Sequence, residues 1–409
     1  MNKLKLLPIA VALALLLGGC EPLYFYSPGE SDEQPPTSSV PALEYDKYLS
    51  EYEEKWQYRY LDKEEQAHYG AIYTTLTDRF DTDESVTVGG ETRYGMRVPL
   101  PTPLHTREEA AELYNAFFRD NPRFFYVDTS YGLEGYMLDD TAYYDTLVLA
   151  YTMDATTRAT ADTQLMQAAN ELVAGCPEGQ DAYWAELYLH DKLVEHCSYA
   201  DAAAEDGGYD TYPQAFNAYG ALVEKQAVCE GYARAMQLLL DMVHIPSTLV
   251  TGRSRENDQE HMWNLVTING QNYHLDVTWD DSEDRLRHSY FNLTTALLER
   301  THSINDGQAG IDTCTAEADN YHIRKGAYFD TYERDAIAEY IAAAFLAGET
   351  VIEMRFAPSK YDNALLFLKN HGLTRSKVDL FLPDGHTPLW TYELLGERDQ
   401  CILTIVKES

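Results

Sequence analysis

Apolar residues recur along the chain in two patterns, one typical of helices and one typical of strands. Spacings of three and four residues predict helices over residues 44–56, 64–76, 106–118, 161–174, 182–196, 334–346 and 361–370. Short alternating or continuous apolar runs predict strands over residues 92–98, 124–127, 132–137, 146–152, 350–356, 388–394 and 401–406. The mixture indicates an α+β protein.

The length and the order of these elements suggest how the chain divides into domains. At roughly 150 residues per domain, a chain of 409 residues argues for two or three. Residues 45–160 are predicted to form a small N-terminal α+β domain, residues 161–320 a core, and residues 321–409 a small C-terminal α/β accessory domain. The C-terminal part carries no residue set that resembles a catalytic constellation, so the reactive residues are expected in the core.

The first twenty residues predict an export signal. Lys3 and Lys5 precede an apolar run over residues 6–17, and small residues follow it. The run is shorter than the about 20 residues of a membrane span. The Leu-Gly-Gly-Cys sequence that ends at Cys20 resembles the lipobox of bacterial lipoproteins, which implies that residues 1–19 are a signal peptide and that Cys20 is lipidated. Ordinary secretion, with Cys20 as a leftover thiol, is the alternative.

Residues 20–44 predict a flexible tether, because prolines among Ser, Glu and Asp bury too little apolar surface to fold. The protein is therefore expected outside the cytoplasm, anchored to the cell membrane by its N-terminal lipid. Acidic residues outnumber basic ones by 67 to 31, which gives a formal charge of −36. A surface of that sign repels a phosphate backbone, so we expect no nucleic-acid partner.

Cys229 falls in the first turn of a predicted buried helix. Apolar residues over 227–243 follow helical spacing from this cysteine onward. The free amides and the dipole at a helix N-terminus stabilise a thiolate, and the same amides can hold an oxyanion. A buried, inert cysteine is the alternative at this position.

A predicted β-hairpin brings a histidine and an aspartate together downstream. The turn Asn269-Gly270 separates two strand-like runs, residues 261–268 and 271–278. With a two-residue turn, Ile268 pairs with Gln271, and the same register makes His261 and Asp276 diagonal neighbours on one face. A loop one residue longer or shorter would put them on opposite faces. The register therefore predicts that the carboxylate reaches the imidazole.

Cys229, His261 and Asp276 together have the composition of a catalytic triad for acyl transfer. His261 would take the proton from Cys229 or form an ion pair with its thiolate, and Asp276 would fix the tautomer of His261. Cys229 would then attack an amide or ester carbonyl. The backbone amide of Cys229 is a candidate donor to the oxyanion.

Several sequence blocks in the core resemble the bacterial transglutaminase-like superfamily. In chain order they are LHDKL (189–193), AYGAL (218–222), AVCEGYA (227–233), HMWN (261–264) and YHLDVTWD (273–280). The resemblance covers about residues 161–300. It implies a papain-like core in which a catalytic helix packs on an antiparallel sheet, with Cys229 as nucleophile, His261 as base and Asp276 as the orienting group.

The resemblance also implies a function. It suggests a membrane-anchored, extracytoplasmic cysteine acyltransferase or hydrolase that acts on amide bonds of proteins or cell-wall peptides. Because the family includes inactive copies, the alternative is a non-catalytic surface lipoprotein that binds peptide or glycan with the same fold.

An aromatic side chain often completes the oxyanion hole in related enzymes, and Tyr219 is the candidate here. The acidic run over residues 280–284 lacks EF-hand spacing, so no calcium and no other cofactor is expected.

Other histidines and cysteines have competing interpretations. His274 shares a face with Asp276 and is the second candidate for the base, although packing explains it better. His190 with Asp191 or His196 suggests a metal pair, but a third ligand is missing. An oxidising exterior permits two disulfides, in any of three pairings, among Cys176, Cys197, Cys314 and Cys401.

Overall fold

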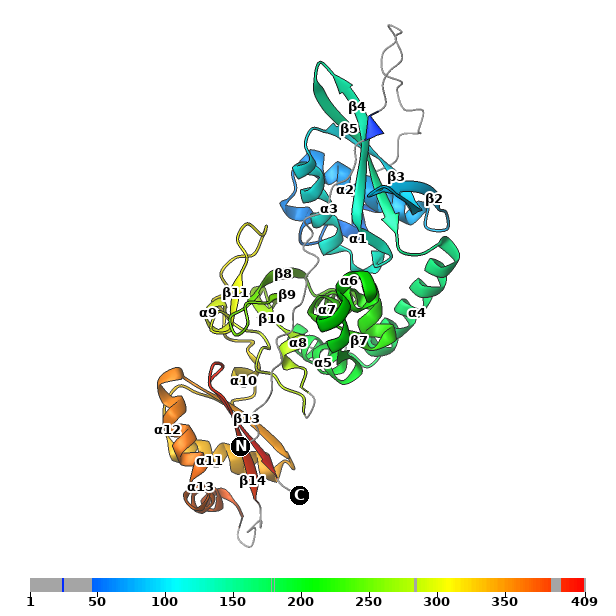
Figure 1. The fold of residues 1–409 in the computed structure, drawn as a ribbon. Helices are drawn as coiled ribbons and strands as arrows, with labels where there is room; N and C mark the ends of the chain where they lie inside the picture. The colour runs from blue at the N-terminus through cyan, green and yellow to red at the C-terminus, as the bar shows by residue number, and fades with distance from the viewer. Residues whose placement is uncertain are drawn as a thin grey trace.

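A computed structural model describes residues 46–177, 181–282, 285–383 and 391–407, together with residues 24, 25 and 179. It shows three successive regions along the molecule: an N-terminal region that ends with β5, a core region from α4 to α10, and a C-terminal region from β12 onward (Figure 1). The predicted signal peptide, residues 1–19, and the predicted lipidation site, Cys20, lie outside the described residues. Of the helices in the described ranges, none has both the length and the apolar character needed to cross a bilayer.

A five-stranded sheet with the strand order β1-β4-β5-β3-β2 forms the centre of the N-terminal region. Its strands are β1 (Tyr24–Phe25), β2 (Glu84–Val88), β3 (Glu91–Leu104), β4 (Val127–Leu138) and β5 (Thr141–Tyr151). Helices α2 (Lys63–Asp78) and α3 (Arg107–Asp120) contact β3, and both begin with a capping box, built on Asp62 and Thr106. Strand β1 runs parallel to β4, so two residues of the predicted tether extend this sheet.

Two predicted elements of this region differ in the structure. In place of a helix over residues 44–56, the chain forms the single turn α1 (Leu49–Tyr52) and a 3₁₀ turn over Tyr58–Tyr60. The tyrosines with helical spacing pack on α2 instead, with the ring of Tyr52 5.4 Å from that of Tyr69. In place of a strand over residues 124–127, Pro122–Phe124 forms a 3₁₀ turn, because the fixed backbone angle of proline suits the first position of a helical turn.

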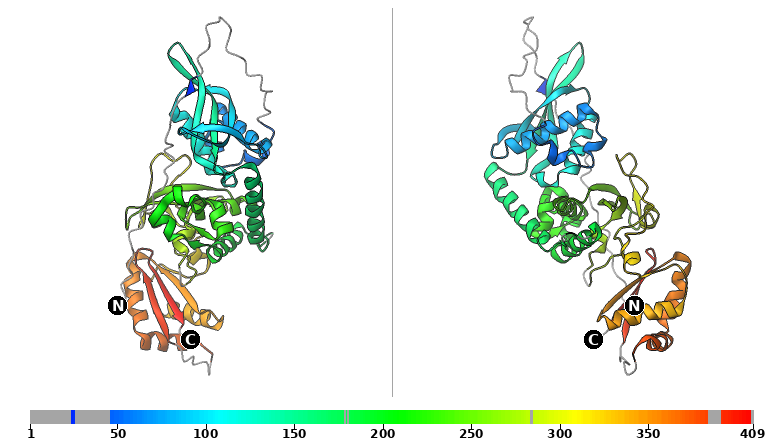
Figure 2. Two further views of the ribbon diagram at one scale, coloured as in Figure 1. Left: turned by 45° about the vertical axis from the view of Figure 1, so that its right-hand side comes forward. Right: turned by 180° about the vertical axis from the view of Figure 1, so that it is seen from behind.

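The core region packs helix α7 (Cys229–Met242) on a four-stranded sheet with the order β10-β9-β8-β11. The strands are β8 (Ser247–Ser254), β9 (Glu260–Ile268), β10 (Gln271–Leu275) and β11 (His302–Ile304), and neighbouring strands are antiparallel. Helices α4 (Ala155–Val173) and α5 (Ala182–His196) also contact α7, and α4 leads from the N-terminal region down one side of the molecule (Figure 2). This confirms the predicted fold class.

Short elements surround α7 and the sheet. Between α5 and α7 lie β6 (Ser198–Tyr199), α6 (Gly208–Thr211), β7 (Gln226–Ala227) and helical turns over Ala203–Gly207, Pro213–Phe216 and Gly220–Glu224. After β10 follow α8 (Val277–Asp280), α9 (Thr295–Leu298) and α10 (Tyr321–Arg324). Strands β6 and β7 pair in parallel, which places Tyr199 beside Ala227, two residues before Cys229.

The C-terminal region has a sheet of its own, with the order β12-β13-β15-β14. Its strands are β12 (Tyr328–Phe329), β13 (Val351–Phe356), β14 (Tyr392–Glu397) and β15 (Ile402–Lys407), and its helices are α11 (Arg334–Leu346), α12 (Pro358–Lys369) and α13 (His371–Val378). Helix α13 is not among the predicted elements. Asn370 ends α12 and caps α13 through a side-chain hydrogen bond from the amide of Leu373, so two short helices follow each other without a loop.

The buried apolar residues form two large clusters that follow these regions. One cluster runs from Tyr52 to Phe291 and joins the N-terminal sheet and its helices to α7 without interruption. The other lies wholly within the C-terminal region, between Ile337 and Ile405. Helix α7 is therefore held in place by the first two regions together.

Candidate functional site

Helix α7 begins with Cys229, as the apolar spacing predicts. The preceding residue, Val228, has an extended backbone and makes no side-chain hydrogen bond to the helix, so no side chain caps the amides of the first turn. Gly231 allows a close approach here, because a Cβ atom at this position would lie 2.5 Å from the carbonyl oxygen of Ala215. The thiol thus lies at a helix N-terminus whose first-turn amides have no side-chain cap.

The hairpin has the predicted register. Ile268 pairs with Gln271 across the Asn269-Gly270 turn, and the pairing continues to Leu275 opposite Asn264. Strand β10 ends there, three residues short of the predicted strand-like run over residues 271–278. Asp276 instead begins α8 as its N-cap, and its Oδ1 atom accepts a hydrogen bond from the amide of Trp279 at 3.2 Å.

The second carboxylate oxygen of Asp276 meets the imidazole of His261. The distance from Nε2 of His261 to Oδ2 of Asp276 is 2.6 Å, a short charge-assisted hydrogen bond. Burial would lower the pKa of His261, but the charge of Asp276 and hydrogen bonds to Asp276 and Cys229 outweigh it and raise that pKa to about 10. Burial would raise the pKa of Asp276, but the charge of His261 and the hydrogen bond to it hold the pKa of that carboxyl well below its usual range. His261 is therefore an imidazolium at neutral pH.

All three side chains are buried. Relative exposure is 1% for Cys229, 6% for His261 and 1% for Asp276. Cys229 packs in a small apolar cluster with Ala233 and Met262. The three cavities identified between described residues are lined by other side chains. A substrate would therefore need a local opening before it could reach the thiol.

Tyr199 is a side chain near the thiol that the sequence analysis did not single out. Its pKa lies above the ordinary value, mainly because of burial and then because of the charges of Cys229, Asp201 and Asp276. The phenol therefore stays protonated and can donate a hydrogen bond close to Cys229. A two-residue strand such as β6 has no periodicity, so only its pairing with β7 reveals this position.

Tyr219, the residue predicted to complete the oxyanion hole, lies elsewhere. Its hydroxyl donates to Oε1 of Gln164 on α4 at 2.8 Å, and its ring stacks on Phe125 with the centroids 5.2 Å apart. Both partners fix its side chain against α4 and the N-terminal region. These contacts engage both the hydroxyl and the ring of Tyr219, and its part in the oxyanion hole stays a prediction.

The other candidate base, His274, has different partners. Its Nδ1 atom accepts a hydrogen bond from Nε1 of Trp263 at 3.1 Å, and its Nε2 atom lies 3.0 Å from Oγ1 of Thr295. Burial, with a smaller contribution from His302, lowers its pKa to about 3. A neutral imidazole that uses both nitrogens in the core is a packing residue.

A second group of histidines and carboxylates lies on the C-terminal side of the core region. Nδ1 of His190 and Nε2 of His288 each lie 2.9 Å from Oδ1 of Asp191, an arrangement that could hold a metal ion. Burial lowers the pKa of His190, but hydrogen bonds to Asp191 and Asp280 raise it to about 9, so a metal ion would have to displace the proton from this ring. The cluster fits an ionic network. His196 takes no part, since its Nε2 atom bonds the carbonyl oxygen of Leu222.

The expected disulfides are absent from the described part of the chain. Five cysteines are free thiols there, namely Cys176, Cys197, Cys229, Cys314 and Cys401. Cys197, Cys314 and Cys401 belong to three different buried clusters, which keeps them apart. No disulfide of the three possible pairings forms among these described residues.

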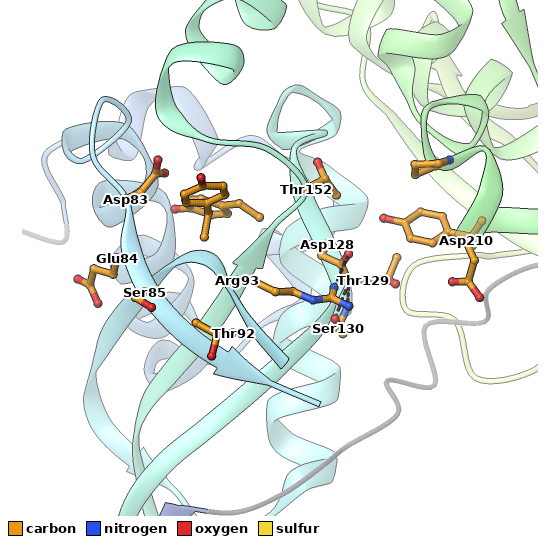
Figure 3. A pocket seen from close by; sticks show the side chains of 14 residues that line it. Asp83, Glu84, Ser85, Thr92, Arg93, Asp128, Thr129, Ser130, Thr152 and Asp210 are labelled. Atoms are coloured by element: carbon orange, nitrogen blue, oxygen red, sulfur yellow. Dashed lines mark hydrogen bonds and ion pairs between the residues drawn. The ribbon is translucent and has the colours of Figure 1, made fainter. Parts of the chain in front are cut away.

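A cavity of about 970 Å³ opens between the N-terminal sheet and the segment around α6. Figure 3 shows Arg93 beside Asp128 in this cavity, where Nη1 of Arg93 donates to Oδ2 of Asp128 at 3.1 Å. Carboxylates, hydroxyls and tyrosine rings make up most of the lining, which consists of Asp83, Glu84, Ser85, Thr92, Arg93, Tyr94, Asp128, Thr129, Ser130, Tyr151, Thr152, Tyr209, Asp210 and Pro213. Such a lining suits a polar ligand.

Residues 166–277 match the family model of the transglutaminase-like superfamily. The matched range contains α7, the hairpin and all three of Cys229, His261 and Asp276. No curated protein matches the sequence.

Solved structures that match part of the chain include a TGase and two proteins named as proposed proteases. The TGase is 13% identical over 36% of this chain and 45% of its own length, with a TM-score of 0.27. A proposed cysteine protease from Cytophaga hutchinsonii is 14% identical over 36% and 54%, with a TM-score of 0.23. A proposed protease from Parabacteroides distasonis is 14% identical over 34% and 29%, with a TM-score of 0.20. The chain thus spans about half of these proteins or less.

Proposed function

We propose that this chain, whose residues 166–277 match the model of the transglutaminase-like superfamily, is a cysteine-dependent acyltransferase or hydrolase acting on amide bonds of proteins or cell-wall peptides. One observation carries this proposal. His261 and Asp276 form a buried pair 2.6 Å apart, and Cys229, at the N-terminus of α7, is one of the groups that raise the pKa of His261. A thiol, an imidazole and an orienting carboxylate in this order are the parts of a cysteine nucleophile.

The reaction follows from these positions. The Cys229 thiolate attacks the carbonyl carbon of an amide, and the amide of Cys229 and the phenol of Tyr199 donate to the oxyanion that forms. The imidazolium of His261 gives its proton to the leaving amine, and the acyl group stays on sulfur as a thioester. Water or a second amine then attacks the thioester, with neutral His261 as base. Asp276 keeps the imidazole in position through both steps.

The proposal includes the place where the reaction occurs. The lipobox-like sequence at Cys20 supports attachment to a membrane by lipid, and the segment after it supports a tether. At a cell surface, protein side chains and cell-wall peptides are the amides within reach. Replacing Cys20 by Ala is expected to release the protein from the membrane fraction, which fractionation with an antibody would measure.

Alkylation of Cys229 tests the catalytic proposal most directly. Iodoacetamide labelling of the full chain at pH 6, followed by mass mapping, is expected to modify Cys229 far faster than an ordinary thiol, whose pKa is about 8.5. His261→Ala should abolish the labelling at this pH. Cys197 and Cys314 serve as internal controls, because burial raises their pKa values to about 12 and about 11. A Cys229 that labels no faster than these two would contradict the proposal.

A second function, binding of a peptide or glycan without catalysis, is favoured by the polar cavity. The cavity is open in the present structure, whereas Cys229 is buried. Calorimetric titration of cell-wall fragments into the Cys229→Ala variant distinguishes the two functions. Binding that survives this change and is lost in Tyr94→Ala would support a binding protein, since Tyr94 exposes half of its surface at the cavity.

A further inference from the structure

A second histidine contacts the carboxylate that orients His261. His302 is the first residue of β11 and is fully buried, and its Nε2 atom lies 3.2 Å from Oδ2 of Asp276. The same Oδ2 atom is the one bonded to His261. Within the described ranges, Nε2 of His302 has no hydrogen bond of regular geometry, so the contact with Asp276 is electrostatic and off the axis of its N–H bond.

Aromatic packing fixes the ring of His302 in this place. Its centroid lies 5.2 Å from that of His261, 5.2 Å from Trp263 and 4.3 Å from Trp279. On the opposite edge, its Nδ1 atom lies 2.9 Å from Oγ1 of Thr301. Any rotation of the ring would break contacts on at least two sides.

The charge state of His302 complements that of His261. Burial lowers the pKa of His302, contact with Asp276 opposes this, and the nearby charge of His261 reinforces it, so the pKa stays below the ordinary value. Two adjacent imidazolium rings would repel each other. The proton therefore resides on His261, and His302 is neutral beside it.

We infer that His302 is a positioning residue of this site: packed against His261 and touching Oδ2 of Asp276, it holds the carboxylate in the orientation in which Oδ2 meets His261 and Oδ1 caps α8. The inference rests on the proposed function and adds a fourth side chain to the same site. A Cys-His-Asp triad needs one histidine, so the burial of a second against the same oxygen requires a reason.

The orientation of the Asp276 carboxylate matters because each of its two oxygens accepts a different hydrogen bond. Oδ1 accepts from the amide of Trp279, and Oδ2 accepts from His261. Rotation of the carboxylate about its own axis would weaken both hydrogen bonds together. A displacement of about 1 Å at a catalytic group can cost about a hundredfold in rate. His302, which touches Oδ2 and packs on the ring of Trp279, restricts that rotation.

The test compares three variants of the full chain with the wild type. His302→Phe keeps the aromatic packing and removes both nitrogens. His302→Leu also removes both nitrogens but replaces the ring by an aliphatic side chain, in case phenylalanine prevents folding. His302→Gln returns a donor within reach of Asp276. His274→Leu is the matched control, since His274 is a buried histidine of the same cluster that bonds Trp263 and Thr295 instead.

The first measurement is the rate of Cys229 alkylation as a function of pH. His302→Phe is expected to slow alkylation at pH 6 by about tenfold or more, and His302→Gln to restore most of the rate. His274→Leu should remain within about twofold of the wild type. If the role of His302 were only structural, His302→Phe and His302→Leu would lower the melting temperature and leave the dependence of the Cys229 alkylation rate on pH unchanged.

The second measurement uses NMR to follow how fast the proton in the His261–Asp276 hydrogen bond exchanges with water. This proton should exchange faster in His302→Phe and at the wild-type rate in His302→Gln and His274→Leu. Unchanged alkylation and unchanged exchange in a folded His302→Phe protein overturn the inference. If wild-type Cys229 is inert, the proposed function fails, and the proton exchange then decides the positioning role on its own.

Discussion

At the scale of single residues, the proton held by His261 determines what the site can do. With its pKa raised to about 10, His261 remains an imidazolium through the neutral range and can deliver a proton to a leaving amine. The carboxylate of Asp276 makes this state stable in a buried place, where an unpaired imidazolium would be costly. What remains to be supplied is stabilisation of the oxyanion, for which the first-turn amides of α7 and Tyr199 are available.

Removal of the Tyr199 hydroxyl should separate acylation from simple thiol reactivity. Tyr199→Phe keeps the ring and removes one donor to the oxyanion, so acylation of Cys229 by p-nitrophenyl acetate should slow about a hundredfold. Alkylation by iodoacetamide forms no oxyanion and should change little. Burst kinetics of nitrophenol release measure the first rate, and mass mapping measures the second.

Tyr219→Phe is the matched control for this comparison. Its hydroxyl bonds Gln164 on α4, so its loss should leave both rates unchanged. Equal slowing of acylation in the two variants, or no slowing in Tyr199→Phe, would assign the oxyanion to the backbone amides alone.

At the scale of elements, the long periodic segments could be predicted from the sequence and the short ones could not. Apolar spacing places α5 and α7, and the Asn269-Gly270 turn places the β9–β10 register that brings His261 to Asp276. The ending of β10 at Leu275 depends on the cap that Asp276 gives to α8, which no period of two indicates. Tyr199 and His302 reach the site through strands of two and three residues, so only long-range pairing reveals them.

The seating of α7 depends on Gly231. A Cβ atom there would meet the carbonyl oxygen of Ala215 at 2.5 Å and the Cβ atom of Ala227 at 2.7 Å, both on rigid segments. Gly231→Ala should therefore lower the free energy of unfolding by about 2 kcal/mol or more and slow the alkylation of Cys229, because the helix that carries the thiol must shift.

Gly372→Ala provides the control for this substitution. Gly372 lies in α13, and the nearest atom to an added Cβ is Oδ1 of Asn370 at 3.8 Å. Alanine in such a helix should be neutral or should stabilise the protein by about 0.5–1 kcal/mol. Urea unfolding measures both variants. A Gly231→Ala protein as stable and as reactive as the wild type would contradict this expectation, because the backbone around α7 would then accommodate the added Cβ atom at no cost in free energy.

At the scale of the whole molecule, buried charges connect the catalytic region to the C-terminal region. His190 on α5 and His288 share Oδ1 of Asp191, and Nδ1 of His288 lies 3.3 Å from Oε2 of Glu353 on β13. Nε2 of His190 lies 3.3 Å from Oδ2 of Asp280, the last residue of α8. Since Asp276 is the N-cap of α8, the C-terminal region is linked to the carboxylate that pairs with His261 through one helical turn and two histidines.

This ionic network should weaken as the pH rises. Burial lowers the pKa of His288, yet hydrogen bonds to Asp191 and Glu353 raise it above the ordinary value, and the pKa of His190 is about 9. Histidines with a raised folded pKa stabilise the fold fully below about pH 6.5, their unfolded value, and lose that contribution as the pH passes the folded value. His288→Gln should therefore cost about 3 kcal/mol of unfolding free energy at pH 6 and clearly less at pH 10, measured by urea unfolding at both values.

His68→Gln is the contrasting control, because burial lowers the pKa of His68 and its replacement should cost no less at pH 10 than at pH 6. A cost of His288→Gln that is the same at both values would mean that stacking of His288 on Tyr321 of α10, with the ring centroids 3.8 Å apart, rather than charge, accounts for the stability that His288 contributes.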